Sequence, residues 1–560
     1  MGLFLSQPTG YHTRKTDRYY NYLPTSALCT TLHCSRPTID RILSITGAPS
    51  LSLRVIRSGK TLYTAHHGFR DVEQHLAPDN DTLHNINSMS KAFISALAAI
   101  IADTGAVSLD EPIATYLPDF SFRDERLAHQ ITITDLLSHR SGINNPDAIW
   151  LGSRNSLLLT KDDAWRMLSS LEQVVPRGSS FLSNNWPYML VGDILEEVTG
   201  QSLGEFLQAY IFAPLGMTRT TTAWDYADHN KAKSYSVLSD LSPIEILPPQ
   251  LGAGNTMEAA GGIKSTIAGL SRFYTAFLSA VMDEFGQPGD DEKGLNTRPS
   301  IFRNCRELMT HHSTIPPATL RKQGYGMGWA RAQLPGPVGR VRLNPGIADP
   351  LEIAKGAPST LVLYHNGSMP GSTTCVCLVP EEEFVIVVLQ NSITAIDTAD
   401  IVCQLVIELL LSPTHPIDFV FHARVLAGEA VARQGRVGAE LLSQRRPGTK
   451  PSEAIEAYAS VYWNCMHTFS IEIRAEGARL GMRLQGRASE EFWLSHYEDD
   501  TFCWWMPHDE IMRRGRYTDY GPKHYLISFS VAVGREVGAL RWAWDPAREG
   551  RPEVFTKETS

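Results

Sequence analysis

One short motif in the chain places a nucleophile beside a base. Ser88 and Lys91 form a Ser-x-x-Lys motif where the polar segment 84–87 gives way to an apolar run with helical spacing. At the start of a helix, three residues of separation put both side chains on one face, one turn apart. The positive end of the helix dipole favours an anionic nucleophile there, and a desolvated lysine can lose its proton and activate a serine hydroxyl. The motif therefore indicates covalent catalysis by Ser88, with Lys91 as the group that accepts its proton.

The same spacing has a purely structural interpretation. A serine and a lysine three residues apart occur by chance about once in a chain of this length. Ser88 could be only the capping residue of the helix, and Lys91 could point into solvent. The motif alone does not decide between these two roles.

The elements that would position this motif belong to the longest of four stretches. Residues 38–415 carry strand patterns at both ends and helix patterns between them, which predicts an α+β domain rather than alternating β-α-β units. Residues 1–37 are predicted to be an N-terminal extension, residues 416–451 a linker, and residues 452–560 a second domain.

Local patterns within the first domain predict several of its elements. Residues 55–63 predict a hairpin, and residues 92–102 predict a helix with one apolar face. Residues 375–379 and 384–391 predict two adjacent buried strands joined by a four-residue turn. The acidic, Gly- and Pro-rich loop 283–294 predicts a surface insertion.

The pattern changes toward the end of the chain. The linker is rich in arginine, which suits either a basic arm that binds a partner or a solvated helix with a hinge, and we favour the helix. From residue 452, short segments of period-2 alternation with close turn signals predict a small antiparallel barrel or sandwich. These segments are 469–477, 478–486, 525–533 and 539–545.

Composition limits the classes of partner. The 560 residues are 43% hydrophobic and 20% charged, an ordinary globular composition that excludes wholesale disorder. The net charge of −9 argues against a nucleic-acid partner, because such binding needs a basic face. No apolar run approaches the roughly 20 residues needed to cross a bilayer, so no stable membrane insertion is expected. The oligomeric state is left open.

Cysteine usage and the start of the chain bear on location. The eight cysteines include no CxxC pair and fit neither a zinc site nor a disulfide framework, and no metal or organic cofactor is implied. The first 37 residues lack the pattern of a signal peptide, which predicts a reducing, cytoplasmic location. The opening MGLFLS meets the myristoylation pattern at Gly2, although a single acyl chain holds a membrane only marginally.

Seven segments between residues 40 and 400 follow one another in an order shared with a known superfamily. They are DTLHNINSMSKAF (81–93), GAVSLDEPIATYLPDF (105–120), ITITDLLSHRSGI (131–143), YIFAPLGMTRT (210–220), AAGGIKST (259–266), YGMGWA (325–330) and YHNGSMPGS (364–372). Together they resemble the class C β-lactamase and penicillin-binding-protein superfamily, in particular members from fungal natural-product pathways. The resemblance implies a β-lactamase/transpeptidase-like fold, an antiparallel sheet flanked by helices with a helical subdomain. The EAYASVYWN opening of the last domain resembles the lipocalin-like barrel that follows some of these enzymes.

The resemblance implies roles for individual residues. Ser88 would be the acyl-accepting nucleophile and Lys91 its proton partner. His365 and Gly367 stand in the family's [Lys/His]-x-Gly strand, where histidine is usual in esterase-like members. Backbone N–H groups of Ser88 and Ser368 would form the oxyanion hole that stabilises the tetrahedral intermediate. By itself, His365 could instead be a buried histidine with satisfied hydrogen bonds.

One element departs from the family pattern. The family carries Tyr-x-Asn, whose tyrosine acts as a base beside the lysine, and the matching stretch here is GSSFLSNNWPYMLVGDILEEVTG (178–200). An ungapped alignment puts Ser183 in place of the tyrosine and keeps Asn185, whereas a shift of one residue puts Leu182 there. Tyr188 falls at the start of the next apolar helix, which indicates packing. A serine cannot replace a phenolate base, because its hydroxyl is too weakly acidic.

Three functions fit these residues. We favour a β-lactamase-like serine hydrolase of the esterase or amidase type, which forms a Ser88 acyl-enzyme with a small-molecule ester, amide or thioester in secondary-metabolite biosynthesis. The second is an acyltransferase or transesterase that uses the same acyl-enzyme. The third, motivated by the lost tyrosine, is a non-hydrolytic protein whose pocket binds a metabolite. β-Lactam hydrolysis is not expected, because HNG replaces Lys-Thr-Gly and the tyrosine is absent.

Overall fold

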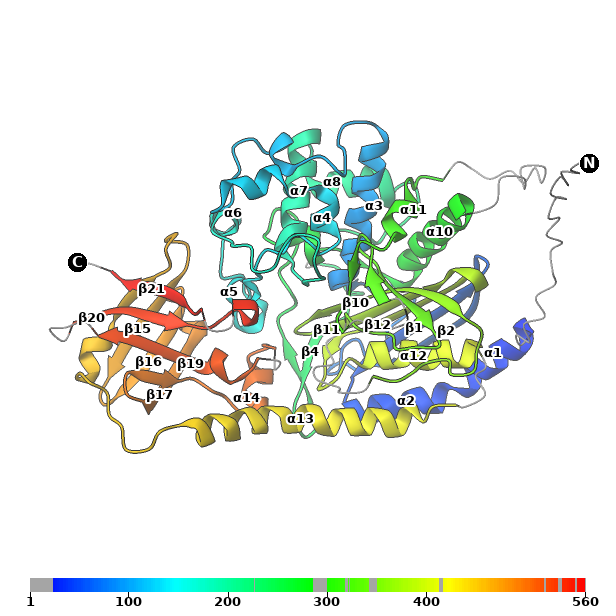
Figure 1. Cartoon of the computed structure of the whole chain (residues 1–560). Coiled ribbons are helices and arrows are strands. Elements are labelled where there is room, and N and C mark those ends of the chain that lie inside the picture. Colours follow the sequence, from blue (N-terminus) through cyan, green and yellow to red (C-terminus); the bar gives the residue numbers. More distant parts are fainter. Residues whose placement is uncertain are drawn as a thin grey trace, which may run out of the picture.

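The chain folds into a large body and a small barrel, joined by one long helix (Figure 1). The computed structural model describes residues 24–225, 227–285, 300–317, 321, 323–341, 350–411, 416–517, 520–531, 536–548 and 551–558. The expected acylation site at Gly2, the first part of the N-terminal extension and most of the predicted loop 283–294 lie outside these ranges. Of the helices within them, none has the length and apolar character needed to traverse a bilayer.

An eight-stranded antiparallel sheet forms the centre of the large body. Its strand order is β2-β1-β12-β11-β10-β9-β8-β7. The predicted hairpin is β1 with β2, and the predicted adjacent strands are β11 and β12, so both predictions are confirmed. Because β1 also pairs with β12, with Leu51 opposite Gln390, the two ends of this domain meet within the sheet. The strands are β1 (Ser50–Arg57), β2 (Lys60–Gly68), β7 (Ser313–Thr314), β8 (Gln323–Tyr325), β9 (Ala330–Leu334), β10 (Thr360–Met369), β11 (Ser372–Val379) and β12 (Phe384–Gln390).

Helices cover both faces of this sheet. Alternate side chains of a strand point to opposite faces. On β11, Val376 and Leu378 enter a core with α3 and α10, whereas Cys375, Cys377 and Val379 enter a core with α1, α2 and α12. Burial on both faces explains why this strand is a continuous apolar run rather than an alternating one. These helices are α1 (Thr25–Cys34), α2 (Arg36–Thr46), α3 (Ser90–Asp103), α10 (Ile267–Phe285) and α12 (Thr398–Leu411).

Helix α3 lies between the sheet and a region of shorter helices. The sequence predicts one apolar face for this helix, but the structure buries every residue from Ser90 to Ile101, because α7, α9 and α11 also pack against it. Polar side chains on α3, including Lys91, are therefore inside the protein. The shorter helices are α4 (Ile133–Leu137), α5 (Asp147–Trp150), α6 (Lys161–Ser169), α7 (Trp186–Thr199), α8 (Leu203–Leu207), α9 (Glu258–Gly261) and α11 (Cys305–Met309). The remaining strands of the large body are β3 (His84–Asn85), β4 (Ser234–Val237), β5 (Pro243–Ile246), β6 (Lys264–Ser265) and β13 (Ser392–Ile393).

The predicted linker contains a 26-residue helix, α13 (Phe419–Gln444), which runs along the bottom of Figure 1 from the large body to the barrel. The carboxylate of Asp418 caps its start by accepting a hydrogen bond from the N–H of Phe421 (2.9 Å). Val437 and Leu441, near its other end, are buried in the same core as the barrel residues. The helix expected in this stretch is thus confirmed, while the domain limits drawn from the sequence stay a prediction.

Eight strands close into an antiparallel barrel, in which β14 pairs with both β15 and β21. The closed barrel confirms the predicted small antiparallel domain. Buried aromatic rings pack against one another within it, with ring centroids of Tyr458, Phe502 and Phe529 5.0–5.8 Å apart. The elements are β14 (Ser460–Trp463), β15 (Ser470–Glu476), β16 (Arg479–Leu484), β17 (Glu491–Glu498), β18 (Thr501–Cys503), α14 (His508–Arg513), β19 (Leu526–Val531), β20 (Val537–Trp542) and β21 (Glu553–Lys557).

A buried carboxylate anchors the barrel to the large body. Glu490 pairs with Arg516 of the barrel domain (3.2 Å), and neither side chain is more than 7% exposed. The same carboxylate accepts hydrogen bonds from the backbone N–H (2.6 Å) and the hydroxyl (3.1 Å) of Ser153 in the large body. Because a buried charge needs such partners, this cluster ties the two domains together.

We predict that Glu490→Ala lowers the free energy of unfolding by about 3–5 kcal/mol, because it leaves the Arg516 guanidinium buried without its partner. Urea denaturation followed by tryptophan fluorescence measures the change. As a control, Glu429→Ala removes an exposed ion pair with Arg436 and should cost at most about 1 kcal/mol. A Glu490→Ala protein as stable as this control would contradict the anchoring role.

Candidate active site

Ser88 lies in the turn that leads into α3. It belongs to a short 3-10 helix (Asn87–Met89) directly before that helix. The preceding Asn87 has a left-handed backbone (φ 50°), which is uncommon for a residue with a side chain. Its amide donates hydrogen bonds to the hydroxyl (2.8 Å) and the carbonyl (3.1 Å) of Ser372 on β11. These bonds hold the strained turn against the sheet.

The amine of Lys91 is buried and in contact with Ser88. Its Nζ lies 2.9 Å from Ser88 Oγ, 2.8 Å from Asn185 Oδ1 and 3.0 Å from the carbonyl oxygen of Ala260. Burial lowers the pKa of Lys91 to about 7, although the nearby Asp147 partly opposes this shift. A neutral amine can donate to Asn185 and Ala260 and still accept the proton of the Ser88 hydroxyl. The geometry therefore suits a general base at neutral pH.

Asn185 is held in place by a carboxylate that the sequence analysis did not identify. The Nδ2 group of Asn185 donates to Asp147 Oδ2 (2.9 Å), which leaves its Oδ1 facing Lys91. Asp147 also accepts hydrogen bonds from the indole of Trp150 (2.7 Å) and the amide of Asn145 (3.0 Å). Burial raises the pKa of Asp147, while these donors and Lys91 lower it. No motif marks this aspartate, since it follows the LLSHRSG segment in an ordinary-looking loop.

Ser183 and Tyr188 lie on opposite sides of Asn185 in the sequence and have different surroundings. The Ser183 side chain is exposed and lines the cavity described below, and none of the three hydrogen bonds of Lys91 reaches it. Tyr188 is buried, donates its hydroxyl to the carbonyl of Leu137 (2.6 Å), and has its ring centroid 5.3 Å from Lys91 Nζ. Burial raises its pKa well above the usual range. Tyr188 therefore packs, as predicted, and the contact of Asn185 with Lys91 fits the alignment that puts Ser183 in the tyrosine position.

His365 on β10 is a buried, hydrogen-bonded imidazole. Its Nδ1 lies 2.7 Å from the carbonyl of Asn366, and its Nε2 lies 2.8 Å from the Tyr325 hydroxyl. Because a carbonyl only accepts, Nδ1 carries the proton and Nε2 accepts from Tyr325. Burial, together with the nearby Lys91, lowers the pKa of His365 to about 3, so the ring is neutral. The residue therefore has satisfied hydrogen bonds and also lines the cavity beside Ser88.

Gly367 allows β10 to approach the turn that carries Ser88. A Cβ atom at this position would lie 2.4 Å from the carbonyl oxygen of Ile86 and 2.4 Å from Thr374 Oγ1. A larger residue at this position would force β10 away from the turn that carries Ser88. The glycine of the His-x-Gly segment thus brings Ser368 and Ser88 to the same cavity.

Both domains line that cavity, which has a volume of about 410 Å³. The large body contributes the predicted residues Ser88, Lys91, Ser183, Asn185, His365 and Ser368, together with Leu182, which the alternative alignment named. The barrel domain contributes a further set, which we call the barrel wall: Arg516, Tyr517, Tyr520, Trp544, Asp545 and Pro546. The barrel wall could not be predicted from the sequence, because local patterns carry no information on contacts between segments hundreds of residues apart.

Two family models match this chain. Residues 36–400 match the model described as Beta-lactamase, which covers more than half of the chain. Residues 444–557, which include the barrel, match a domain of unknown function, DUF3471.

Curated proteins are similar to this chain at 23–28% sequence identity over long segments. "Unguisins hydrolase ungD" of Aspergillus violaceofuscus is 23% identical over 362 residues, which are 61% of this chain and 58% of that protein. "Protein flp" of Staphylococcus aureus strain MW2 is 28% identical over 177 residues, 31% of this chain and 34% of that protein. The chain thus spans less than two thirds of these curated relatives. A solved structure, the octameric penicillin-binding protein homologue from Pyrococcus abyssi, aligns with 94% of this chain and all of its own, with a TM-score of 0.55 and 18% identity, which shows a shared fold.

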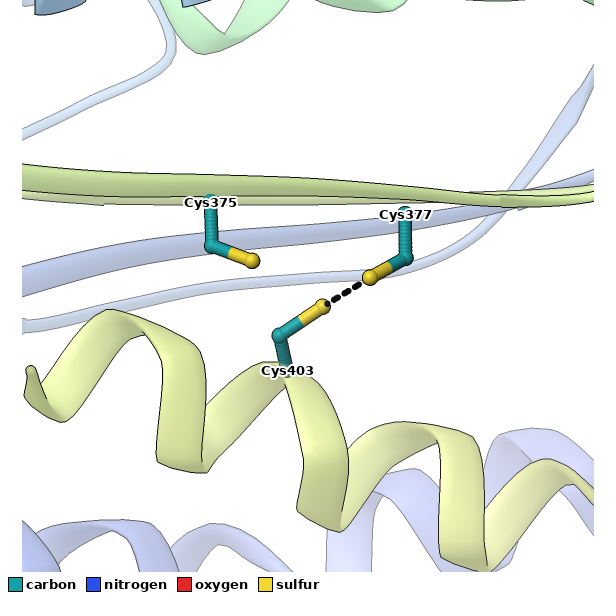
Figure 2. Close-up of side chains that lie close together, drawn as sticks. All are labelled: Cys375, Cys377 and Cys403. Carbon is teal, nitrogen blue, oxygen red and sulfur yellow. Dashed lines mark hydrogen bonds between the residues drawn. The ribbon is translucent and has the colours of Figure 1, made fainter. Parts of the chain in front are cut away.

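A cluster of three cysteines lies between β11 and α12, in the core on that face of the sheet (Figure 2). None of the three lines the cavity. The sulfurs of Cys375 and Cys377 on β11 and of Cys403 on α12 all lie within 4.8 Å of one another, and those of Cys377 and Cys403 are 3.0 Å apart. The sequence spacing, with no CxxC pair, did not predict this cluster. Three thiolates at such distances could hold a soft metal ion. Burial raises the pKa of each thiol well above its usual range, which favours neutral thiols packed in the apolar core.

We predict that a thiol reagent modifies the exposed Cys34 and Cys465 in the native protein but leaves Cys375, Cys377 and Cys403 unmodified. All five should react after denaturation, and peptide mass spectrometry identifies the modified sites. Modification of the buried cluster in the native protein would contradict its assignment as inert packing. Modification that occurs only after a chelator is added would instead reveal a bound metal.

Proposed function

Because the chain belongs to the β-lactamase family, we propose that it is a serine hydrolase that works through an acyl-enzyme on Ser88. The observation that carries the proposal is the 2.9 Å contact between Ser88 Oγ and a lysine amine whose pKa is about 7. A hydroxyl beside a neutral, buried amine is an activated nucleophile. The retained His365-x-Gly367 segment at the same cavity supports the proposal further.

The proposed reaction has two halves. Ser88 Oγ attacks the carbonyl carbon of the substrate while Lys91 takes the hydroxyl proton, and the N–H groups of Ser88 and Ser368 stabilise the negative oxygen. Collapse of this intermediate breaks the bond to the leaving group, which takes the proton from Lys91. Water then attacks the acyl-enzyme and gives a proton to Lys91, and this proton returns to Ser88 Oγ as the acid leaves.

This mechanism does not require the family tyrosine. A lysine with an ordinary pKa would be protonated at neutral pH and would need a second base, whereas burial lowers the pKa of Lys91 to about 7 and so makes the neutral amine accessible near neutral pH. Asn185 and Asp147 act as positioning residues in this proposal, because their hydrogen bonds orient the amine toward Ser88. Ser183 lines the cavity and is assigned to substrate contact.

The substrate class follows from the same chemistry. We propose a small-molecule ester, amide or thioester, handled in the cytoplasm during secondary-metabolite biosynthesis. The similarity to the Aspergillus violaceofuscus protein named "Unguisins hydrolase ungD" supports hydrolysis. Transfer of the acyl group to an alcohol or amine would use the same acyl-enzyme, so product analysis with and without an added alcohol distinguishes the two reactions.

We predict that a fluorophosphonate probe adds once to the purified protein and that Ser88→Ala abolishes the adduct, with turnover of esters falling on the order of 10⁴-fold or more. Intact-mass analysis detects the adduct, and circular dichroism checks that the variant is folded. Ser443→Ala, on the exposed end of α13, is the control and should label like the wild type. A wild-type protein without an adduct would contradict the acyl-enzyme and favour a non-hydrolytic pocket.

We also predict that the labelling rate rises with pH through a midpoint near 7, because the neutral form of Lys91 is the active one. From pH 5 to pH 8 the rate should increase about a hundredfold. Lys91→Met, which removes the titrating amine, should label far more slowly and without this pH dependence. A wild-type midpoint near 10 would show that the amine is not desolvated and would exclude it as the base at neutral pH.

A further inference from the structure

The barrel domain is hydrogen-bonded to the strand that the proposed function assigns to the oxyanion hole. The hydroxyl of Tyr517 donates to the carbonyl oxygen of Ser368 at 2.8 Å, across a sequence separation of 149 residues. It also lies 3.4 Å from the sulfur of the next residue, Met369. The contact joins the barrel wall to the end of β10.

The bond from Tyr517 shows which way the backbone N–H of Ser368 faces. β9 pairs with β10 only from Thr360 to Tyr364, so within the described residues the strand from His365 to Met369 has a strand partner, β11, on one side only. In an antiparallel ladder, the N–H and C=O of one residue point to the same side of the strand. Because the Ser368 carbonyl is bound by Tyr517 on the cavity side, its N–H faces the cavity as well.

The charges of the barrel wall are already bound by protein groups. Arg516 pairs with the buried Glu490, and Asp545 accepts hydrogen bonds from the amide of Asn144 (3.1 Å) and the backbone N–H of Asn145 (3.2 Å). Tyr517 and Tyr520 are half-buried in the same wall. A substrate therefore meets aromatic surface on this side of the cavity and needs no ionic group of its own.

We propose that the barrel domain completes the active site: Tyr517 positions the Ser368 peptide as an oxyanion donor, and the barrel wall accepts an uncharged, bulky apolar acyl group. This inference rests on the proposed function, because it concerns the same Ser88 reaction. It assigns to the second domain a part in catalysis beyond its attachment to the first. Tyr517 is a positioning residue, since it acts on the substrate through Ser368.

The first test separates positioning from folding. Tyr517→Phe keeps the ring and removes only the hydrogen bond, so kcat for p-nitrophenyl acetate should fall about five- to tenfold with KM within twofold. Fluorophosphonate labelling should slow by the same factor, because the phosphoryl oxygen occupies the same hole. The matched control is Tyr497→Phe, whose hydroxyl also donates to a backbone carbonyl at 2.8 Å, that of Leu441, away from the cavity. This control should match the wild type in kcat and in labelling.

Two outcomes would overturn the role of Tyr517. One is a Tyr517→Phe protein with unchanged kcat and labelling, and the other is an equal loss in Tyr497→Phe, which would indicate a general structural effect. Both leave the proposed function intact, provided that the wild type is labelled on Ser88. Absence of labelling in the wild type would instead contradict the proposed acyl-enzyme on Ser88.

The second test concerns the acyl group. The wild type should hydrolyse p-nitrophenyl phenylacetate with kcat/KM at least about tenfold above that for the acetate, because the phenyl ring is buried against the barrel wall. The charged p-nitrophenyl hemisuccinate should have a lower kcat/KM than the acetate. Its carboxylate would be buried against the barrel wall without a partner to offset the cost of losing water. Tyr520→Ala should lower kcat/KM for the phenylacetate by a larger factor than kcat/KM for the acetate, and so reduce the preference for the aromatic ester. Equal rates for the three esters, or a preference for the hemisuccinate, would overturn the assigned substrate class.

Discussion

The burial of the Lys91 amine, whose hydrogen bonds to Ser88, Asn185 and Ala260 go to uncharged oxygen atoms, is the constraint on which the remaining geometry depends. A charged amine in the protein interior is unfavourable, so its proton is lost at a lower pH than in water. Asp147, whose charge acts on Lys91, accepts its hydrogen bond from the Nδ2 group of Asn185, whereas the amine donates to Oδ1 of the same amide. A direct ion pair would stabilise the charged form of the lysine and remove its capacity to accept a proton. The Asn185 amide therefore orients the amine and also separates it from the negative charge of Asp147.

This arrangement depends on packing that extends well beyond the cavity. Helix α3 is buried from Ser90 to Ile101 because the sheet and the shorter helices pack around it, so Lys91 is only 3% exposed although it lines the cavity. The strained turn at Asn87 and the absence of a side chain at Gly367 then let β10 approach the turn that carries Ser88. The buried amine and the left-handed turn at Asn87 are each energetically unfavourable, and the glycine at 367 alone indicates no function. Together they place a hydroxyl, an amine and a strand end around one cavity.

Local patterns in the sequence predicted much of the fold. The hairpin β1–β2, the helix after Ser88, the strands β11 and β12, and four of the barrel strands (β15, β16, β19 and β20) follow from periodicity and turn residues, which are properties of neighbouring positions. The contact of Ser88 with Lys91 could also be predicted, because it depends on three residues of helix. Asn185 required the family resemblance, since it meets Lys91 from a different helix.

Other parts of the site could not be predicted, because they depend on contacts between distant segments. Asp147 carries no motif, Tyr517 reaches Ser368 from the other domain, and the Cys375 cluster forms only when β11 and α12 pack together. The burial of α3 on every side was not predicted for the same reason. The spacing of apolar residues indicates one buried face, but it does not show which other helices cover the remaining faces. Tertiary packing, and not local preference, decides these features.

The pairing of β1 with β12 has a consequence for how the chain is made. The hydroxyl of Ser50, at the start of β1, binds Asn391, 341 residues further along. At synthesis rates of about 5–20 residues per second, this separation corresponds to roughly 15–70 s. During that time the first hairpin exposes an open strand edge that invites pairing with other chains. The large sheet cannot be completed before most of the polypeptide has left the ribosome, so the growing chain is expected to need protection from aggregation.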